Sequence, residues 1–287
     1  MLPLVSSDTI FEPVPHWAKI PHGVWLKEAT SVAVDKDDNV FVFNRGNKPM
    51  LVFDPDGNVI DMWGNDNPSD DVRISRDPYG NAMQFWNTWF NRPHAVTIDH
   101  EGNVWVVDDN GQQIHKMSKS GEFLMSIGSG EAAPKQSGKM FNRPTDVAIS
   151  KKTGEIFITD GYDNSRIHRF DAQGKLMMSW GVIGTDPGEF NVPHNLALID
   201  DEEVAVCDRE NYRVQIFSLD GEFKRQWMVH KACAIEVTGT GEDVRIYVAE
   251  QGPTRGSPNR GEPNLGNRVG IYDRDGNRIL RFGSREI

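Results

Sequence analysis

Two histidines stand at the same place in a repeating sequence pattern. Segments 92–99 (RPHAVTID) and 192–198 (VPHNLAL) both place Pro-His directly before alternating apolar residues. Imidazole is a common ligand of protein-bound metals, and two histidines at equivalent places of a repeating structure can face one centre. His94 and His194 are therefore candidate metal ligands. A single Pro-His pair would more simply start a strand, with its histidine hydrogen-bonded to nearby backbone.

The pattern that must position these histidines is a repeat of hairpins. Apolar stretches flank short turns rich in Asp, Ser and Gly, and the turn glycines are Gly57, Gly121, Gly174, Gly221 and Gly276. Such a turn between apolar stretches is typical of a β-hairpin whose glycine adopts a positive φ. A second hairpin precedes each of these, and the units open at Thr30, His94, Thr145, His194 and Cys233. The repeat predicts four short strands in each of five complete units.

Units of about 50 residues with four strands each predict an all-β fold, a β-propeller of four-stranded blades. Two stacked sandwiches are the alternative, but a sandwich gives no reason for one four-strand phrase to recur. We expect residues 29–287 to form the propeller and residues 1–28 to form an N-terminal leader that packs on the ring. The ring either closes with five blades or needs a sixth that is truncated from this sequence or supplied by a partner.

Composition argues against several other classes of protein. The 287 residues carry a net charge of −11 and no basic run, which disfavours nucleic-acid binding. We expect a cytoplasmic protein with no membrane partner, because the sequence has no apolar stretch of ~18 residues and no charged segment followed by an apolar one at its start. Cys207 and Cys233 lie at apolar strand positions, which favours buried thiols over a disulfide.

Several phrases resemble one known family. They are 141–149 (FNRPTDVAI) with its continuation to Ile167, Pro193-His194, and 208–215 (DRENYRVQ). From about Ser31 to Gly283 the chain resembles the NHL-repeat propellers of the peptidyl-α-hydroxyglycine α-amidating lyase family, which have six blades. The resemblance implies a zinc ion held in the channel by three histidines from alternate blades. Two of these match His94 and His194; the third would belong to a sixth unit, and His22 or His230 could substitute for it.

Tyr162 lies in a bend that is one residue longer than its counterpart in the fourth unit. The third unit runs from Asp160 to Arg166 and the fourth from Asp208 to Arg213. An added residue at a strand end re-aims its neighbours, as bulges near active sites do, so Tyr162 could face the channel; otherwise it packs beneath the loop. The resemblance assigns the matching tyrosine to catalysis, where it takes the proton of the substrate hydroxyl or stabilises the alkoxide.

Arg45 and Arg209 match the family's two active-site arginines. The resemblance implies that they bind the substrate carboxylate and stabilise developing charge, a role suited to a planar, always-charged group. Arg166 and Arg213 instead occupy the repeat's own Asn-x-Arg position. We expect these two to be structural and to pair with the aspartates that end the preceding strands.

The reaction implied by the resemblance is zinc-dependent cleavage of the C–N bond of an α-hydroxyglycine-type carbinolamide, giving an amide and glyoxylate, or the same chemistry on a related small substrate. The substrate would be a small molecule or peptide with a carboxylate, and the protein could form an oligomer. The resemblance also implies a structural Ca²⁺ as a further candidate cofactor, with the carbonyls of Val32 and Val96 as ligands. Insertion 65–91, rich in aromatic residues, predicts a lid or rim over the channel, or else a cluster that only packs the loop.

Two other functions are compatible with the same fold. The chain could be a metal-dependent hydrolase, or a non-catalytic NHL propeller that binds a partner protein on one face, because fold alone does not determine function.

Overall fold

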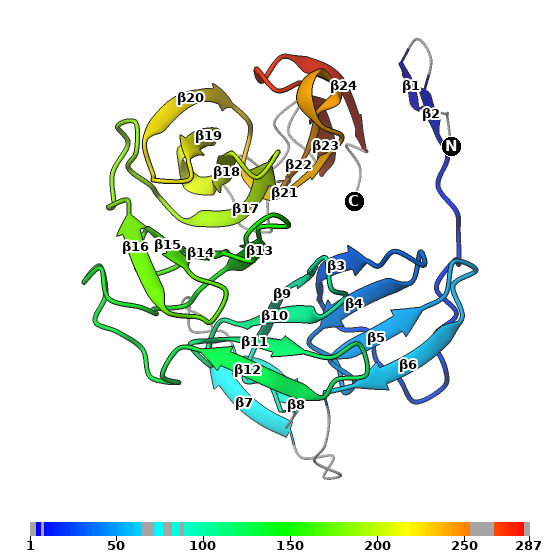
Figure 1. Ribbon diagram of the computed structural model, residues 1–287. Helices are drawn as coiled ribbons and strands as arrows, with labels where there is room; N and C mark the ends of the chain where they lie inside the picture. The colour runs from blue at the N-terminus through cyan, green and yellow to red at the C-terminus, as the bar shows by residue number, and fades with distance from the viewer. Residues whose placement is uncertain are drawn as a thin grey trace. The chain divides into compact units, whose positions relative to one another are not determined.

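The computed structural model describes residues 4–6, 9–64, 72–76, 82–86, 89–252 and 267–283. Within these residues the chain forms five four-stranded antiparallel sheets and two two-stranded hairpins (Figure 1). The strands of each four-stranded sheet follow one another in chain order, so each sheet is a meander. This is the blade of a β-propeller, and the predicted all-β propeller of four-stranded blades is confirmed.

The blades are numbered here in chain order. Blade one comprises β3 (Ala29–Val34), β4 (Val40–Asn44), β5 (Met50–Phe53) and β6 (Val59–Trp63). Blade two comprises β9 (Pro93–Ile98), β10 (Val104–Asp108), β11 (Gln113–Met117) and β12 (Phe123–Ile127). Blade three comprises β13 (Asp146–Ile149), β14 (Ile156–Asp160), β15 (Arg166–Phe170) and β16 (Leu176–Trp180).

Blade four comprises β17 (Pro193–Ile199), β18 (Glu203–Asp208), β19 (Arg213–Ser218) and β20 (Phe223–Met228). Blade five comprises β21 (Ala232–Thr238), β22 (Arg245–Glu250), β23 (Arg268–Tyr272) and β24 (Arg278–Gly283). The two hairpins are β1 (Leu4–Ser6) with β2 (Thr9–Phe11) and β7 (Val72–Arg76) with β8 (Ala82–Trp86). Two short 3-10 helices, η1 (Arg209–Asn211) and η2 (Gly241–Asp243), complete the described elements.

In blades two, three and four the second strand is the most deeply buried. Every residue of β10, β14 and β18 is buried, whereas the fourth strands β12 and β16 are partly exposed. Each second strand ends in a polar residue, and in blades two and four its side chain holds the segment that enters the blade. Asp108 accepts the backbone N–H groups of Asn91 and Arg92 at 2.6 and 2.7 Å, and Asp208 accepts that of Asn191 at 2.7 Å. These bonds anchor the segments directly before both Pro-His pairs.

The turn glycines confirm the predicted hairpins. All five have φ between 78° and 86°, a region that glycine enters without steric cost: Gly57, Gly121, Gly174, Gly221 and Gly276. A Cβ at Gly221 would lie 2.8 Å from ring atoms of Trp180, which ends the last strand of the preceding blade. The same contact recurs between Gly121 and Trp63 and between Gly276 and Trp227.

The N-terminal leader reproduces this contact at blade one. Gly57 approaches the carbonyl of Trp17, whose ring centroid lies 5.5 Å from that of Phe53 and whose Nε1 donates to the Pro55 carbonyl at 2.9 Å. Trp17 therefore fills a place beside blade one. In blades two, four and five the same place is filled by a tryptophan of the preceding blade. Nearer the start of the chain, Phe11 stacks on Phe282 of β24 with centroids 4.4 Å apart.

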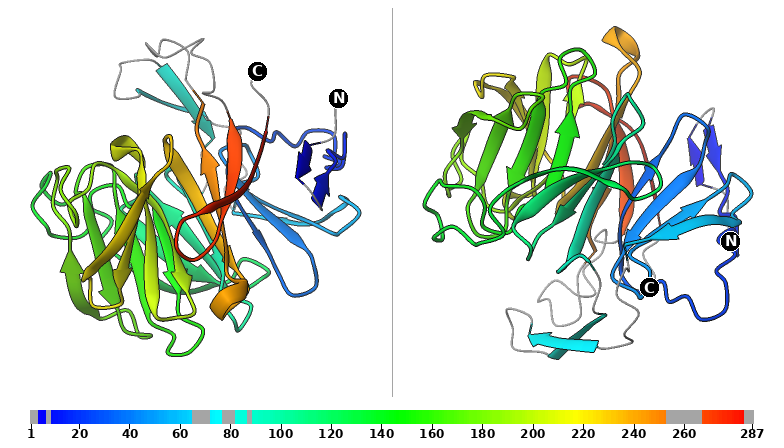
Figure 2. Two further views of the ribbon diagram at one scale, coloured as in Figure 1. Left: turned by 90° about the horizontal axis from the view of Figure 1, so that it is seen from above. Right: turned by 60° about the horizontal axis from the view of Figure 1, so that its bottom comes forward.

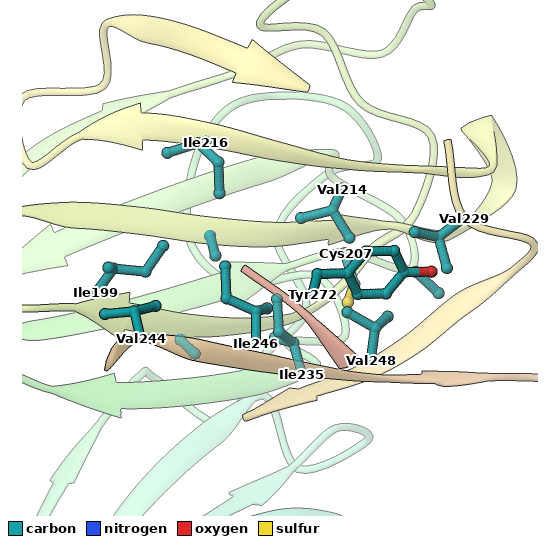
Figure 3. Close-up of a cluster of buried hydrophobic side chains, with 13 residues drawn as sticks. Ile199, Cys207, Val214, Ile216, Val229, Ile235, Val244, Ile246, Val248 and Tyr272 are labelled. Atoms are coloured by element: carbon teal, nitrogen blue, oxygen red, sulfur yellow. The ribbon is translucent and has the colours of Figure 1, made fainter. Parts of the chain in front are cut away.

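The chain comprises two compact units. The N-terminal half contains Pro15–Pro134 and Lys139–Val147, and the C-terminal half contains Met1–Val14, Lys135–Gly138 and Ala148–Ile287. Each half has its own apolar core. Phe43, Val52 and Val106 belong to the core of the N-terminal half, and Ile216 and Ile246 to an apolar cluster of the C-terminal half (Figure 3).

Insertion 65–91, predicted as a lid or rim, falls largely outside the described residues. Its described parts are residues 89–91 and the strands β7 and β8, which form a separate hairpin (Figure 2). Trp89 is 43% exposed, whereas Phe90 is buried and meets the ring of Phe43 edge-on, with centroids 5.0 Å apart. The insertion therefore returns to blade two through a residue packed in the core of the N-terminal half.

Candidate functional site

Three of the predicted site residues meet in the C-terminal half. Tyr162 lies in the bend between β14 and β15, and its Oη is 3.1 Å from Nε2 of His194 on β17. The two rings are edge-on, with centroids 5.6 Å apart. Arg209, which begins η1 after β18, places its Cζ 5.6 Å from the centroid of the Tyr162 ring, within cation–π range. Tyr162 therefore lies between a histidine and an arginine.

Both predicted metal ligands use the same ring nitrogen for the same purpose. Nδ1 of His94 lies 2.6 Å from the carbonyl oxygen of Thr145, and Nδ1 of His194 lies 2.7 Å from that of Cys233. Each acceptor is the opening residue of the next blade. A carbonyl can only accept, so Nδ1 carries the proton in both rings, and a neutral imidazole then has its lone pair on Nε2. This tautomer is the one that histidine ligands adopt when their Nδ1–H is held by a backbone carbonyl.

Arg209 belongs to a small charged network beside His194. Its Nε donates to Glu210 Oε1 at 2.9 Å, and Lys231 Nζ donates to Glu210 Oε2 at 3.0 Å. Burial acts to raise the pKa of Glu210, but the hydrogen bond from Lys231 and the charge of Arg209 outweigh it and hold that pKa below its ordinary value. Glu210 is therefore a carboxylate shared between two cations.

Arg45 lies next to the other histidine, in the N-terminal half. Its Nε donates to the carbonyl of Pro93 at 3.1 Å, one residue before His94, and its Nη1 pairs with Glu28 at 2.5 Å. The Arg45 side chain is 11% exposed, so this guanidinium is held on two sides. The N-terminal half thus brings Arg45 beside His94, as the C-terminal half brings Arg209 beside Tyr162 and His194.

A buried carboxylate also lies near His94. Asp109 is fully buried, and its Oδ2 contacts Arg92 Nη1 at 2.5 Å and Arg143 Nη2 at 3.2 Å. Arg92 and Arg143 are the second residues of two matching phrases, Asn-Arg-Pro-His and Asn-Arg-Pro-Thr. Burial raises the pKa of the preceding residue, Asp108, to about 6 although three backbone N–H groups donate to its carboxylate.

Arg45, Asp109 and Arg209 occupy one position of the repeat, the first residue after the second strand. Their backbone N–H groups donate to carbonyls just before the first strand of the same blade, at 2.8, 3.2 and 3.2 Å respectively. This position places a side chain beside the entry to the first strand, where His94 and His194 stand. The sequence reasoning identified the two arginines by resemblance but missed Asp109. It also missed Glu210 and Lys231; aligning this one position over the blades would have revealed the charged set.

Arg213 and the two cysteines have the structural roles expected of them. Arg213 Nε pairs with Asp208 Oδ2 at 2.8 Å, and the same guanidinium donates to three backbone carbonyls of residues 185–189, which confirms its structural role. Cys207 and Cys233 are both free thiols, as predicted. Cys207 is buried, whereas Cys233 is only half-buried, and burial raises the pKa of the Cys233 thiol.

Two further histidines, His22 and His230, were candidates for the third ligand. His22 lies exposed in a turn of the leader, and His230 stacks on Tyr212 with ring centroids 5.3 Å apart. Burial lowers the pKa of His230, which favours a neutral ring. Of the two carbonyls considered for calcium, that of Val96 accepts the Ser31 hydroxyl at 3.4 Å. Across the described ranges, no group of three or more His, Cys, Asp and Glu side chains is arranged to hold a metal ion.

Comparison with known proteins places these repeats in a recognised class. A family model described as the NHL repeat matches residues 141–170 and 190–217, which cover most of blades three and four. A probable peptidyl-α-hydroxyglycine α-amidating lyase of Caenorhabditis elegans is 47% identical over 133 residues, covering 45% of this chain and 37% of that protein. Peptidyl-glycine α-amidating monooxygenase B of Xenopus laevis is 34% identical over 234 residues, covering 78% of this chain and 26% of that protein. The chain thus spans well under half the length of either relative.

A solved structure shares the fold at much lower identity. A protein of unknown function from Bacteroides caccae aligns with a TM-score of 0.57 and 14% identity, covering 92% of this chain and 84% of that chain. In the part of the chain that the structure describes, no helix has the length and apolar character needed to cross a membrane.

Proposed function

Because the chain belongs to the peptidyl-α-hydroxyglycine α-amidating lyase family of NHL-repeat propellers, we propose that it is itself a lyase acting on an α-hydroxyglycine-type carbinolamide. In this reaction the substrate R–CO–NH–CH(OH)–COO⁻ loses its C–N bond and yields the amide R–CO–NH₂ and glyoxylate. The observation that carries the proposal is the contact of the Tyr162 hydroxyl with His194, beside the guanidinium of Arg209. A proton acceptor and a cation next to each other are what this elimination needs.

Each residue has a separate task in the proposed reaction. In its ionised form Tyr162 Oη accepts the proton of the substrate hydroxyl, the C–O bond becomes the aldehyde C=O, and the electrons of the C–N bond pass to the amide nitrogen. The same proton ends on that nitrogen, so atoms and charge balance. Arg209 and Arg45 bind the carboxylate of the glyoxylate moiety, for which a guanidinium supplies paired N–H donors.

A zinc ion fits the two histidines by the chemistry of their rings. His94 and His194 both keep the proton on Nδ1 and present Nε2 as the ligating nitrogen. We propose that these two nitrogens bind the same Zn²⁺, an assignment supported by their equivalent positions in alternate blades of the repeat. Bound zinc would supply Lewis acidity toward the hydroxyl or carboxylate oxygen. Calcium bound through the carbonyls of Val32 and Val96 is proposed on the family resemblance alone.

Release of glyoxylate from α-hydroxyhippurate tests this function. The purified chain, supplied with Zn²⁺, is expected to yield equal amounts of glyoxylate and benzamide. Replacement of His194 by Ala should abolish the release without preventing folding, which circular dichroism would check. A folded wild-type chain that yields no glyoxylate with zinc present would contradict the lyase assignment and would favour a non-catalytic propeller that binds a partner protein.

A further inference from the structure

The two histidine-bearing blades share one arrangement of charged side chains. In each, a carboxylate near the end of the second strand pairs with a basic residue of the next blade, two positions before the carbonyl that accepts the histidine's Nδ1–H. We propose that Asp109 and Glu210 are positioning residues that orient His94 and His194 through these ion pairs. This inference rests on the proposed function only for its consequence, which is binding of the metal by Nε2.

In the N-terminal half the arrangement runs through Arg143. Asp109 Oδ2 lies 3.2 Å from Arg143 Nη2, and two residues further along the chain the carbonyl of Thr145 accepts Nδ1–H of His94 at 2.6 Å. Asp109 also contacts Arg92, two residues before His94 itself. One fully buried carboxylate therefore ties together the backbone segment that carries the histidine and the segment that carries its acceptor.

The C-terminal half has a comparable pair, with its carboxylate one position later in the repeat. Glu210 Oε2 lies 3.0 Å from Lys231 Nζ, and two residues further the carbonyl of Cys233 accepts Nδ1–H of His194 at 2.7 Å. The Glu210 and Lys231 side chains are 28% and 26% exposed. The pairing of acid with base is thus preserved although Asp-Arg has been replaced by Glu-Lys and the burial differs. Such recurrence points to a shared requirement at both histidines.

Backbone conformation shows why these segments need an anchor. Arg143 and Lys231 have φ of +62° and +39°, a region that residues with a Cβ enter only at a cost. Arg143 also precedes Pro144, which restricts its backbone further. An ion pair at the side chain of such a residue holds the strained turn in place. The carbonyl two residues later then keeps its direction toward the imidazole.

The opposite case is found in blades one and three, which open with Thr30 and Thr145 instead of histidine. At the first and second positions after the second strand, where Asp109 and Glu210 stand, blade three has Gly161 and Tyr162 and blade one has Arg45 and Gly46. The carboxylate partner of Arg45 is Glu28, directly before its own blade. Blades one and three, which open without a histidine, therefore have no carboxylate at either of these two positions.

Loss of the anchor has a defined consequence for the ring. Without the carboxylate at 109, Arg92 and Arg143 become neighbouring like charges and the two segments separate. The Nδ1–H bond to Thr145 then weakens, and the imidazole can rotate or shift its proton to Nε2, where it would block a metal. Partners that orient metal-bound histidines typically contribute about 10- to 100-fold to metal affinity.

The test reads each histidine separately by NMR of ¹⁵N-labelled protein without metal at pH 8. His94→Gln and His194→Gln assign the two imidazoles. In the wild type, each ring should show a protonated Nδ1 and an unprotonated Nε2. Asp109→Asn should convert His94 to a mixture of tautomers and leave His194 unchanged, and Glu210→Gln should do the reverse. If both rings keep the wild-type pattern in both variants, the positioning role is wrong.

A second test exchanges the charges of the half-exposed pair Glu210–Lys231. Its result does not depend on whether variants of the buried Asp109 fold. Glu210→Lys and Lys231→Glu should each weaken Zn²⁺ binding by about 10- to 100-fold in a chelator competition. The double exchange should recover most of the affinity. Glu155→Gln, which breaks a comparable pair with Arg169 at 2.8 Å in blade three, is the matched control and should leave affinity unchanged. Failure of the double exchange to recover affinity, with its fold intact, would overturn the proposal.

These results are separable from those on the proposed function. A wild type that shows the Nδ1–H pattern and its loss in Asp109→Asn, yet releases no glyoxylate, would support the positioning role and contradict only the lyase assignment. A wild type that releases glyoxylate, while both rings keep the wild-type tautomer in both variants, would support the lyase assignment and contradict the positioning role.

Discussion

Replacing Tyr162 by Phe isolates the proton-transfer step. The phenyl ring can keep its edge-on packing against His194, with centroids 5.6 Å apart, and its position 5.6 Å from the Arg209 guanidinium. Only the hydroxyl is removed, and with it the 3.1 Å contact to His194 Nε2. Tyr162→Phe therefore measures the contribution of one oxygen atom while the rest of the site is kept.

The substitution should lower both the catalytic rate and the stability, by amounts that can be compared. General acid–base groups typically contribute about 10²- to 10⁴-fold, so kcat should fall by that factor, equal to about 3–5 kcal/mol of activation free energy. The folded protein loses one half-buried hydrogen bond, which contributes about 0.5–1.5 kcal/mol to the free energy of unfolding. The rise in activation free energy should therefore exceed the fall in the free energy of unfolding several-fold.

Initial rates of glyoxylate release and urea unfolding curves measure both quantities on the same preparations. Tyr212→Phe is the matched control, because Tyr212 also packs beside a histidine, His230, but lies outside the proposed chemistry. It should keep the wild-type kcat. A Tyr162→Phe enzyme with a kcat within about threefold of the wild type would refute the assignment of proton transfer to this hydroxyl.

Two further predictions concern the scaffold and its pH dependence. Gly221→Ala should lower the free energy of unfolding by about 1–3 kcal/mol more than Gly188→Ala, since both have positive φ but only Gly221 would press a Cβ against Trp180; equal losses in urea unfolding would contradict this. The hydrogen bond and charge of Arg225 lower the pKa of Glu203 from 4.5 to about 2, so Glu203 stabilises the fold fully above pH 4.5 and loses that effect as pH falls toward 2. Glu203→Gln should cost about 1–2 kcal/mol at pH 7 and progressively less in unfolding curves from pH 5 to pH 2.5; a difference independent of pH would be inconsistent with this ion pair.

Most of the fold could be predicted from local features of the sequence. The turn glycines and the apolar runs between them determine where each hairpin lies, because positive φ and burial on both faces are properties of single residues and short segments. The bend at Tyr162 was also visible, since one added residue between Asp160 and Arg166 changes the local register. These inferences need no knowledge of which segments meet in space.

The charged partners of the histidines could not be predicted in the same way. Asp109 and Arg143 are 34 positions apart, and Glu210 and Lys231 are 21 apart, so their pairing depends on how consecutive blades stack. The carbonyls of Thr145 and Cys233 leave no trace in residue type, because every residue has one. The repeat and the resemblance both indicated the histidines, and the resemblance indicated the arginines, whereas the groups that hold them emerged only from the structure.

Anomalous diffraction at the zinc edge, on crystals of the wild-type chain grown with Zn²⁺, tests the central claim most directly. We expect a single peak at about 2.0–2.1 Å from Nε2 of His94 and from Nε2 of His194. Crystals of an active enzyme in which these two nitrogens share no peak would contradict it.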